Sequence, residues 1–218
     1  MPDSAKPSIA LAKRDAQLVA EFGAAKEAVV GFGKGGRVIG LTKGQFSLID
    51  LIKALLQITG PAHLTLSTWT AGVRDVENIG FLVERGELLS LRLLVDRSFP
   101  QRQPQYVGAV RRVFGDDAVR ITRTHAKFAI LRAPGWDVIV RSSMNLNRNR
   151  QFENFDIDDD ARICDHFEAL VSEMFDAQAS GFAVPLPQVE LGFDRSLGDT
   201  VTQWDGASEW DKPVRGMF

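Results

Sequence analysis

A histidine and a lysine stand two positions apart at His125 and Lys127, and a serine and an asparagine stand two apart at Ser143 and Asn145. Two apolar segments joined by a Pro-Gly turn separate these pairs, so a β-hairpin would fold the second pair back beside the first. Side chains two apart on a strand emerge from the same face. The spacing therefore predicts one cluster that holds an imidazole, a cation and two polar groups.

Such a cluster can cleave a phosphodiester. A neutral imidazole attacks phosphorus, and water resolves the resulting phosphohistidine. Histidine suits this role because its side chain exchanges a proton near neutral pH. We expect Lys127 and Asn145 to hold the non-bridging oxygens in the transition state, and Ser143 to add a hydrogen bond. This scheme uses no metal ion and no other cofactor. Loop formation is the structural alternative for Ser143 and Asn145, because such side chains often bond their own backbone.

Residues 124–157 resemble the signature of the phospholipase D superfamily, H-x-K-x4-D followed by G/S-S-x-N. Residues 63–72 and 82–96 are similar to the strand, helix and strand that precede this signature, so the resemblance covers about residues 45–176. It implies a phospholipase D-like α/β sandwich and a phosphodiesterase of the single-motif, bacterial nuclease-like branch.

Two positions depart from the family pattern. Arg132 stands where the signature has aspartate, and Arg141 stands where a glycine often precedes the serine pair. The aspartate supports the site in the family, and some single-motif nucleases lack it. Glu153 resembles the downstream acidic residue that orients the catalytic histidine in the smaller nucleases. A purely structural role for Glu153 is the alternative.

The leaving oxygen needs a proton, because an alkoxide departs poorly. His63 and His166 lack a lysine two residues on, so neither supplies a second motif. We therefore expect a symmetric homodimer in which two copies of His125 meet across a twofold axis, one as nucleophile and one as general acid.

The net charge of −2 hides a strong asymmetry along the chain. Residues 92–150 hold 12 basic and 4 acidic residues, whereas residues 151–218 hold 4 basic and 15 acidic residues. A basic middle suits a polyphosphate ligand, because Lys and Arg displace counterions from a nucleic-acid backbone. Alternatively, the acidic segment packs on the basic one and neutralises it.

Four arginines flank the motif and are the candidate phosphate contacts: Arg123, Arg141, Arg148 and Arg150. Solvated surface charge is the alternative for each of them. The single cysteine, Cys164, excludes an internal disulfide framework, and no Cys/His cluster has the spacing of a structural zinc site. The first twenty residues lack the apolar segment of a secretion signal, and no apolar run approaches the roughly 18 residues of a membrane span. We expect a cytoplasmic protein without membrane insertion.

Hydrophobic periodicity predicts an α/β fold with a mixed β-sheet flanked by helices on both faces. The expected helices are 9–31, 44–59, 73–87, 105–115 and 161–180, and the expected strands are 63–70, 88–96, 118–122, 126–131, 137–142 and 152–158. Residues 1–41 are expected to form an N-terminal helix and a Gly-rich connector, 42–182 the phospholipase D-like domain, and 183–218 an extended acidic tail.

The sequence favours a metal-independent nuclease that cleaves DNA, or less readily RNA, through a phosphohistidine. One alternative is a catalytically impaired member of the superfamily that binds nucleic acid or serves in assembly, since function follows the site rather than the fold. A lipid phosphodiesterase is another alternative, although the basic segment is rich in arginine rather than apolar residues.

Overall fold

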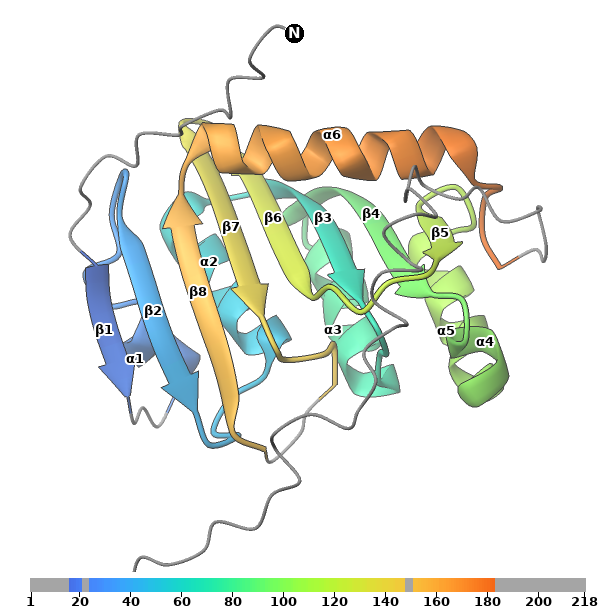
Figure 1. The fold of residues 1–218 in the computed structure, drawn as a ribbon, viewed down its shortest axis with the longest axis horizontal. Coiled ribbons are helices and arrows are strands. Elements are labelled where there is room, and N and C mark those ends of the chain that lie inside the picture. The colour runs from blue at the N-terminus through green and yellow to red at the C-terminus, as the bar shows by residue number, and fades with distance from the viewer. Residues whose placement is uncertain (1–15, 21–23, 148–150, 183–218) are drawn as a thin grey trace, which may run out of the picture. The chain divides into compact units, whose positions relative to one another are not determined.

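The computed structural model describes residues 16–20, 24–147 and 151–182 (Figure 1). Within them, one mixed sheet of eight strands has the order β1-β2-β8-β7-β6-β3-β4-β5. The strands are β1 (Ala16–Ala20), β2 (Arg37–Thr42), β3 (Ala62–Thr68), β4 (Leu88–Asp96), β5 (Val119–Thr122), β6 (Phe128–Ala133), β7 (Trp136–Ser142) and β8 (Glu153–Asp159).

The sheet has two parallel parts joined by an antiparallel part. Strands β3, β4 and β5 are parallel, and β1 is parallel to β2. Between them, β6, β7 and β8 form an antiparallel meander that pairs with β3 on one side and with β2 on the other. The two outer parts are thus held together by a hairpin and its extension.

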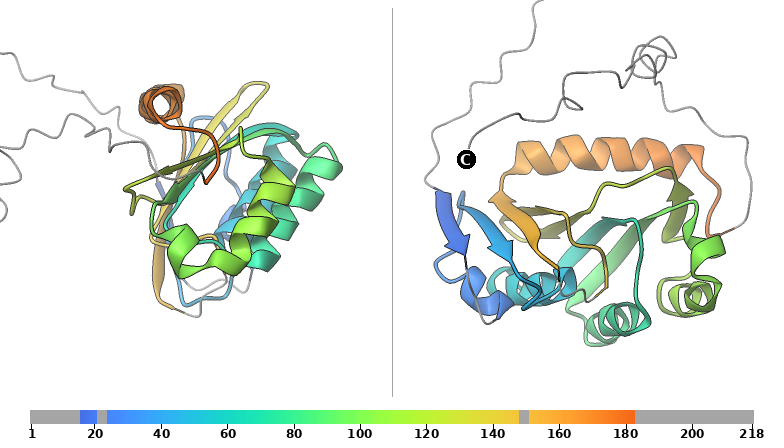
Figure 2. Two further views of the ribbon diagram at one scale, coloured as in Figure 1. Left: turned by 90° about the vertical axis from the view of Figure 1, so that its right-hand side faces the viewer. Right: turned by 60° about the horizontal axis from the view of Figure 1, so that its bottom comes forward.

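Helices cover both faces of the sheet (Figure 2). The long helix α6 crosses one face, and the other helices lie on the opposite face. The helices are α1 (Ala25–Ala28), α2 (Leu48–Thr59), α3 (Val73–Glu84), α4 (Phe99–Arg102), α5 (Pro104–Phe114) and α6 (Ala161–Ala177). This arrangement confirms the predicted α/β class with a mixed sheet between helical layers.

Two apolar cores hold these layers together. The larger core joins α2, α3 and α5 to one face of the sheet and includes Leu51, Leu55, Val76 and Val110. The smaller core lies under α6, where Cys164 and Val171 contact side chains of β4, β6 and β7. Alternate residues of the central strands supply the two cores, as the twofold repeat of a strand requires.

The prediction of a helix over 9–31 is wrong where the structure describes this segment. Ala16–Ala20 is strand β1, and only Ala25–Ala28 is helical. The expected Gly-rich connector also contains strand β2, which pairs with β1 and β8. In these residues, pairing with strands distant in the sequence overrides the local helix propensity. Gly40 faces Phe155 across the β2–β8 pair, and an added Cβ would lie 2.2 Å from the ring of Phe155.

The remaining predicted helices and strands are present, with shifted ends. Helix α2 begins later than expected, because Ser47 and Asp50 form its capping box while Thr42 and Gln45 bond in the preceding turn. The short helix α4 was not predicted. Strand β6 begins at Phe128, so His125 and Lys127 precede it rather than lie on it.

Within the described residues, no helix is both long and apolar enough to cross a membrane. The predicted tail at 183–218 lies outside these residues.

Candidate active site

One end of the sheet gathers all five predicted catalytic residues. Strand β6 runs opposite to β3 and β5, so the segment before β6 lies beside the last residues of β3. Strand β7 ends next to the start of β6, and β8 starts next to the end of β7. His125 and Lys127 precede β6, Ser143 and Asn145 follow β7, and Glu153 opens β8.

The His125 and Lys127 side chains are in direct contact. Lys127 Nζ lies 3.1 Å from Nδ1 and 3.4 Å from Nε2 of the imidazole, and it donates to the carbonyl oxygen of His125 at 2.9 Å. An ammonium group only donates, so a ring nitrogen that bonds to it accepts through its lone pair. The donor and acceptor roles of the two ring nitrogens in this contact depend on the imidazole tautomer.

Lys127 is a buried cation at the rim of the sheet, with 9% of its surface exposed. Burial lowers the pKa of its ammonium group below the ordinary lysine value, and the negative charge of Glu153 opposes this shift. A buried cation can bind an oxyanion strongly, because little water screens it.

Ser143 is tied to the first residues of β8. Its hydroxyl bonds to Glu153 Oε2 and accepts a 2.9 Å bond from the amide of Asn154. The amide of Ser142 donates to the carbonyl of Lys127 at 3.0 Å. The ends of β6, β7 and β8 are therefore cross-linked by polar contacts.

Glu153 acts on Lys127 through its charge and on Ser143 through a hydrogen bond. Among the described residues, no hydrogen bond joins Glu153 to the ring of His125. Its connection to the histidine therefore runs through the lysine.

Asn145 lies beside the end of β3, because the amide of the next residue, Leu146, donates to Thr70 O at 3.2 Å. Asn145 Oδ1 is buried and has no hydrogen-bond partner among the described residues. An unsatisfied buried polar group costs free energy, so a ligand or water that bonds to the amide would stabilise this loop.

The two other histidines lie away from this cluster. His63 is the second residue of β3, pairs with Arg132 across the sheet and bonds to Ser90 at 2.7 Å. His166 is on α6, where its ring contacts Phe167. The described chain therefore brings one histidine to this end of the sheet.

Arg132, at the position of the family aspartate, lies at the opposite end of β6 from His125. Its guanidinium bonds to Asp137 at 2.6 Å, Asp165 at 2.5 Å and Glu168 at 3.0 Å. Burial lowers its pKa, but these three carboxylates outweigh burial and raise it. The residue therefore fastens α6 to the sheet.

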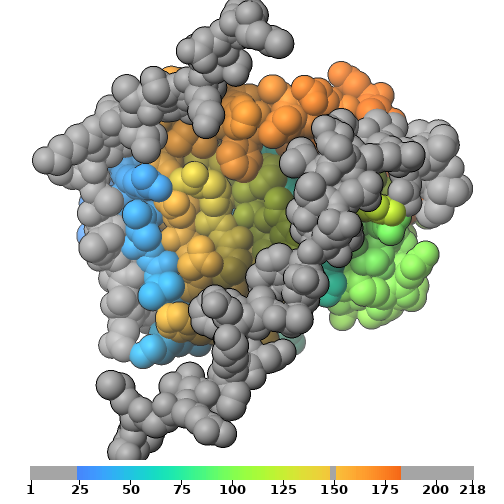
Figure 3. Space-filling model, in the orientation of Figure 1, coloured from blue at the N-terminus to red at the C-terminus, as the bar shows by residue number. Residues whose placement is uncertain are grey.

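Arg141 also bonds inside the protein. Its guanidinium contacts Asp156 at 2.9 Å and Asp158 at 2.5 Å, and Arg37 of β2 bonds to the same two carboxylates. This network lies on the face that α6 crosses, because Ile139, two residues before Arg141 on β7, packs under α6. Figure 3 views the molecule from this side, with α6 in orange. Arg141 thus has acidic partners already, whereas Arg123 is exposed. Arg148 and Arg150 lie outside the described residues.

The acidic third of the chain pairs with part of the basic middle. Acidic residues of β8 and α6 pair with Arg92, Arg132 and Arg141. Arg97 and Arg123, both exposed near the active-site end, have no ion pair with a described residue. These two arginines therefore place uncompensated positive charge near the candidate catalytic residues.

Two residues beside His125 were not singled out in the sequence. The ring of Trp69 lies 5.5 Å from that of His125, and the guanidinium of Arg102 lies 3.7 Å from the centroid of the Trp69 ring. Trp69 follows β3 and Arg102 ends α4. These segments lie beside the motif because β3 pairs with β6, and the sequence spacing does not indicate this.

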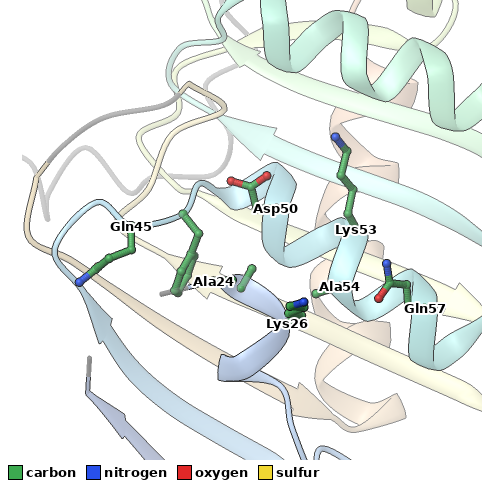
Figure 4. Close-up of a pocket in the computed structure, with 9 residues that line it drawn as sticks. Ala24, Lys26, Gln45, Asp50, Lys53, Ala54 and Gln57 are labelled. Carbon is green, nitrogen blue, oxygen red and sulfur yellow. The ribbon is translucent and has the colours of Figure 1, made fainter. Parts of the chain in front are cut away.

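Among the described residues, no group of three or more His, Cys, Asp and Glu side chains is arranged to hold a metal ion. A pocket of about 240 Å³ lies between α1 and α2 (Figure 4), and none of the candidate catalytic residues lines it. Lys26, Gln45, Asp50, Lys53 and Gln57 supply its polar lining.

No protein-family model and no curated protein matches the sequence. Solved structures that are similar to this one include the following three. The phospholipase D family member Nuc from Salmonella typhimurium is 11% identical, over 67% of this chain and 98% of that chain, with a TM-score of 0.47. NucT from Helicobacter pylori is 13% identical, over 66% and 99%, with a TM-score of 0.46. Polyphosphate kinase from Porphyromonas gingivalis is 15% identical, over 76% and 29%, with a TM-score of 0.48. Identity at this level bears on the fold alone.

Proposed function

We propose that this chain, an α/β protein with a phospholipase D-like motif and fold, is a metal-independent phosphodiesterase that cleaves nucleic acid through a phosphohistidine. The observation that carries the proposal is the contact between Lys127 Nζ and the ring of His125, with Glu153 and Ser143 beside it. The imidazole is a nucleophile, and the buried ammonium is an oxyanion-binding group within reach of the same phosphate.

In the first step, a neutral ring nitrogen of His125 attacks phosphorus. A P–N bond forms and the P–O bond to the leaving group breaks. Lys127 and Asn145 hold the non-bridging oxygens while charge builds on them, and Ser143 adds a hydrogen bond. The departing oxygen takes a proton from a general acid.

In the second step, water attacks the phosphohistidine. The general acid has become a base, and it takes the proton of the attacking water while the P–N bond breaks. The products are a phosphomonoester and an alcohol, and both histidines return to their starting states. This sequence of two displacements needs no change in oxidation state.

The acid and base of these steps is His125 of a second copy of the chain. His63 and His166 lie away from the cluster, so neither can protonate the leaving oxygen. A twofold axis beside His125 would supply an identical imidazole, one ring neutral and the other charged.

A nucleic-acid substrate fits the charges at this end of the sheet. Arg97 and Arg123 are exposed and unpaired with described residues, so they can bind phosphates on either side of the scissile bond. DNA is the expected substrate, with RNA second.

The test is cleavage of labelled DNA, RNA and a phospholipid in excess EDTA, by the natural protein and by His125→Ala. We expect EDTA-resistant cleavage of DNA, reduced at least about 1,000-fold by the substitution. A strict requirement for magnesium would refute the mechanism. Binding without cleavage would favour the catalytically impaired alternative.

A further inference from the structure

We propose that Trp69 and Arg102 form a subsite for one unpaired nucleotide next to the phosphate that His125 attacks. The proposal rests on the proposed function for the nature of the ligand, and on the geometry of these two side chains for its location. Neither residue belongs to the H-x-K motif, and they come from segments about 30 residues apart in the chain.

The two side chains form a stack that is already assembled without a ligand. The guanidinium of Arg102 lies over the indole at 3.7 Å from its centroid. Arg102 Nη2 donates to the carbonyl of Trp69 at 3.0 Å, and Nε donates to Ser98 Oγ at 2.8 Å. These bonds hold the planar cation on the ring, so little side-chain entropy remains to be lost on binding.

The position of the stack relates it to catalysis. The Trp69 ring lies 5.5 Å from the His125 ring at an interplanar angle of 52°. A ligand on this wall would therefore lie within one nucleotide of a phosphate bound at the imidazole. The cation–π pair of Lys34 and Trp136 is the useful contrast, because Trp136 begins β7 at the end of the sheet opposite His125.

Arg102 still has donors to offer. Its side chain is exposed, and no carboxylate of the described residues pairs with it. A guanidinium carries five N–H donors, and the bonds to Trp69 and Ser98 engage only part of them. The outer face of such a stacked cation can accept a nucleobase, and its edge can bind a phosphate.

The shape of this ligand is that of an unpaired nucleotide. In a duplex the bases are stacked inside the helix, so a planar wall next to the scissile phosphate cannot reach their faces. In a single strand or a frayed end the base is free to stack. The exposed cations Arg97 and Arg123 lie nearby, after β4 and β5, and can bind the adjoining backbone.

The test measures how binding changes when one base is removed from the strand and when one side chain of the stack is removed from the protein. Binding of labelled eight-nucleotide DNA and RNA strands is measured by anisotropy in the His125→Gln background, which prevents turnover. In one series of strands, each position in turn is replaced by an abasic nucleotide, which keeps the phosphate and removes the base. The same series is then measured with Trp69→Ala and with Arg102→Gln.

We expect one abasic position to weaken binding by about five- to 150-fold, the range of base-stacking effects. In Trp69→Ala and Arg102→Gln, the intact strand should bind weakly and that abasic position should cause little further loss. Trp69→Phe should restore most of the base dependence. The matched controls Trp136→Phe and Lys34→Gln should retain the full abasic effect.

The subsite would be overturned if an abasic position weakened binding equally in the protein with Trp69 and Arg102 intact and in Trp69→Ala. It would also be overturned if binding depended on the base at no position. Tighter binding of a blunt duplex than of the single strand would also overturn it. The result is independent of cleavage, so a protein that hydrolyses no phosphodiester can still pass this test. A DNA or RNA preference would identify the natural strand.

Discussion

At the scale of single residues, Lys127 is the centre of the candidate site. Its ammonium group contacts the ring of His125 and is stabilised by the negative charge of Glu153. Its carbonyl oxygen accepts a hydrogen bond from the amide of Ser142. Its burial lowers the pKa of the ammonium group, and Glu153 limits this shift. The lysine must stay protonated to hold a phosphate oxygen, so its pKa sets an upper pH limit for activity.

The substitution Glu153→Gln tests this coupling. The amide can still accept the bond from Ser143, but it no longer raises the pKa of Lys127. In the natural protein, the alkaline limb of kcat/KM should fall below the ordinary lysine pKa, because burial favours the neutral amine. In Glu153→Gln this limb should move to lower pH. The measurement is the pH profile of cleavage, with the exposed Glu77→Gln as control.

An unchanged limb, or one that moves to higher pH, would show that Glu153 does not act through Lys127. A uniform drop in rate at all pH values would assign Glu153 to a structural role instead.

The sequence could predict the motif residues because their types and spacing lie within one hairpin. It could not predict that Arg141 bonds to Asp156 and Asp158, because that contact depends on the register between β7 and β8. The sequence could not predict the pairing of Trp69 with Arg102 for a similar reason. Their stack depends on where β3 and α4 end relative to β6.

At the scale of elements, the meander β6-β7-β8 determines where the site lies. Its antiparallel turns return the chain to the same end of the sheet, next to the carboxyl ends of β3, β4 and β5. At the other end of β6, Arg132 attaches helix α6 to the sheet through hydrogen bonds to Asp165 and Glu168 on that helix. The aspartate of the family motif would meet like charges here.

Arg132 therefore contributes to stability rather than to the reaction. Arg132→Gln should lower the free energy of unfolding by about 1–3 kcal/mol, since it leaves three carboxylates without their cation, partly screened by water. Arg132→Asp should be more destabilising, because it adds a fourth carboxylate. Neither should change kcat of the folded protein by more than about twofold. Urea unfolding and cleavage assays measure both effects.

The exposed pair of Arg85 and Glu87 is the matched control. Arg85→Gln should change stability by less than about 0.5 kcal/mol. A gain of activity in Arg132→Asp would contradict the structural role and would indicate that an aspartate at position 132 supports the reaction.

The elements themselves were predictable where the pattern was local. The nearly continuous apolar run of β4 is in the sequence, and Gly60 ends α2 as expected. The first strands were not, because Ala-rich residues 16–20 have no strand pattern of their own. They become a strand by pairing with β2, which in turn pairs with β8 more than 100 residues later.

At the scale of the whole molecule, the proposed mechanism requires two chains for one reaction. The described residues place one histidine at the catalytic end, so a shared site loses its function when either copy lacks His125. This requirement differs from that of a dimer with two independent sites.

Mixtures of natural and His125→Ala chains, unfolded and refolded together, separate these cases. With a shared site, activity should follow the square of the natural fraction, about one quarter at an equal mixture. Independent sites would give about one half. Mixing with the Arg85→Gln variant should leave activity unchanged, and native mass spectrometry would verify that chains have exchanged.

The stereochemical course at phosphorus tests the central claim most directly. The substrate is a dinucleotide with a chiral phosphorothioate linkage, cleaved in ¹⁸O-labelled water. Each in-line displacement inverts phosphorus, so attack by His125 followed by attack of water should give net retention. Net inversion would mean that water attacks the diester in a single displacement, and it would contradict the phosphohistidine.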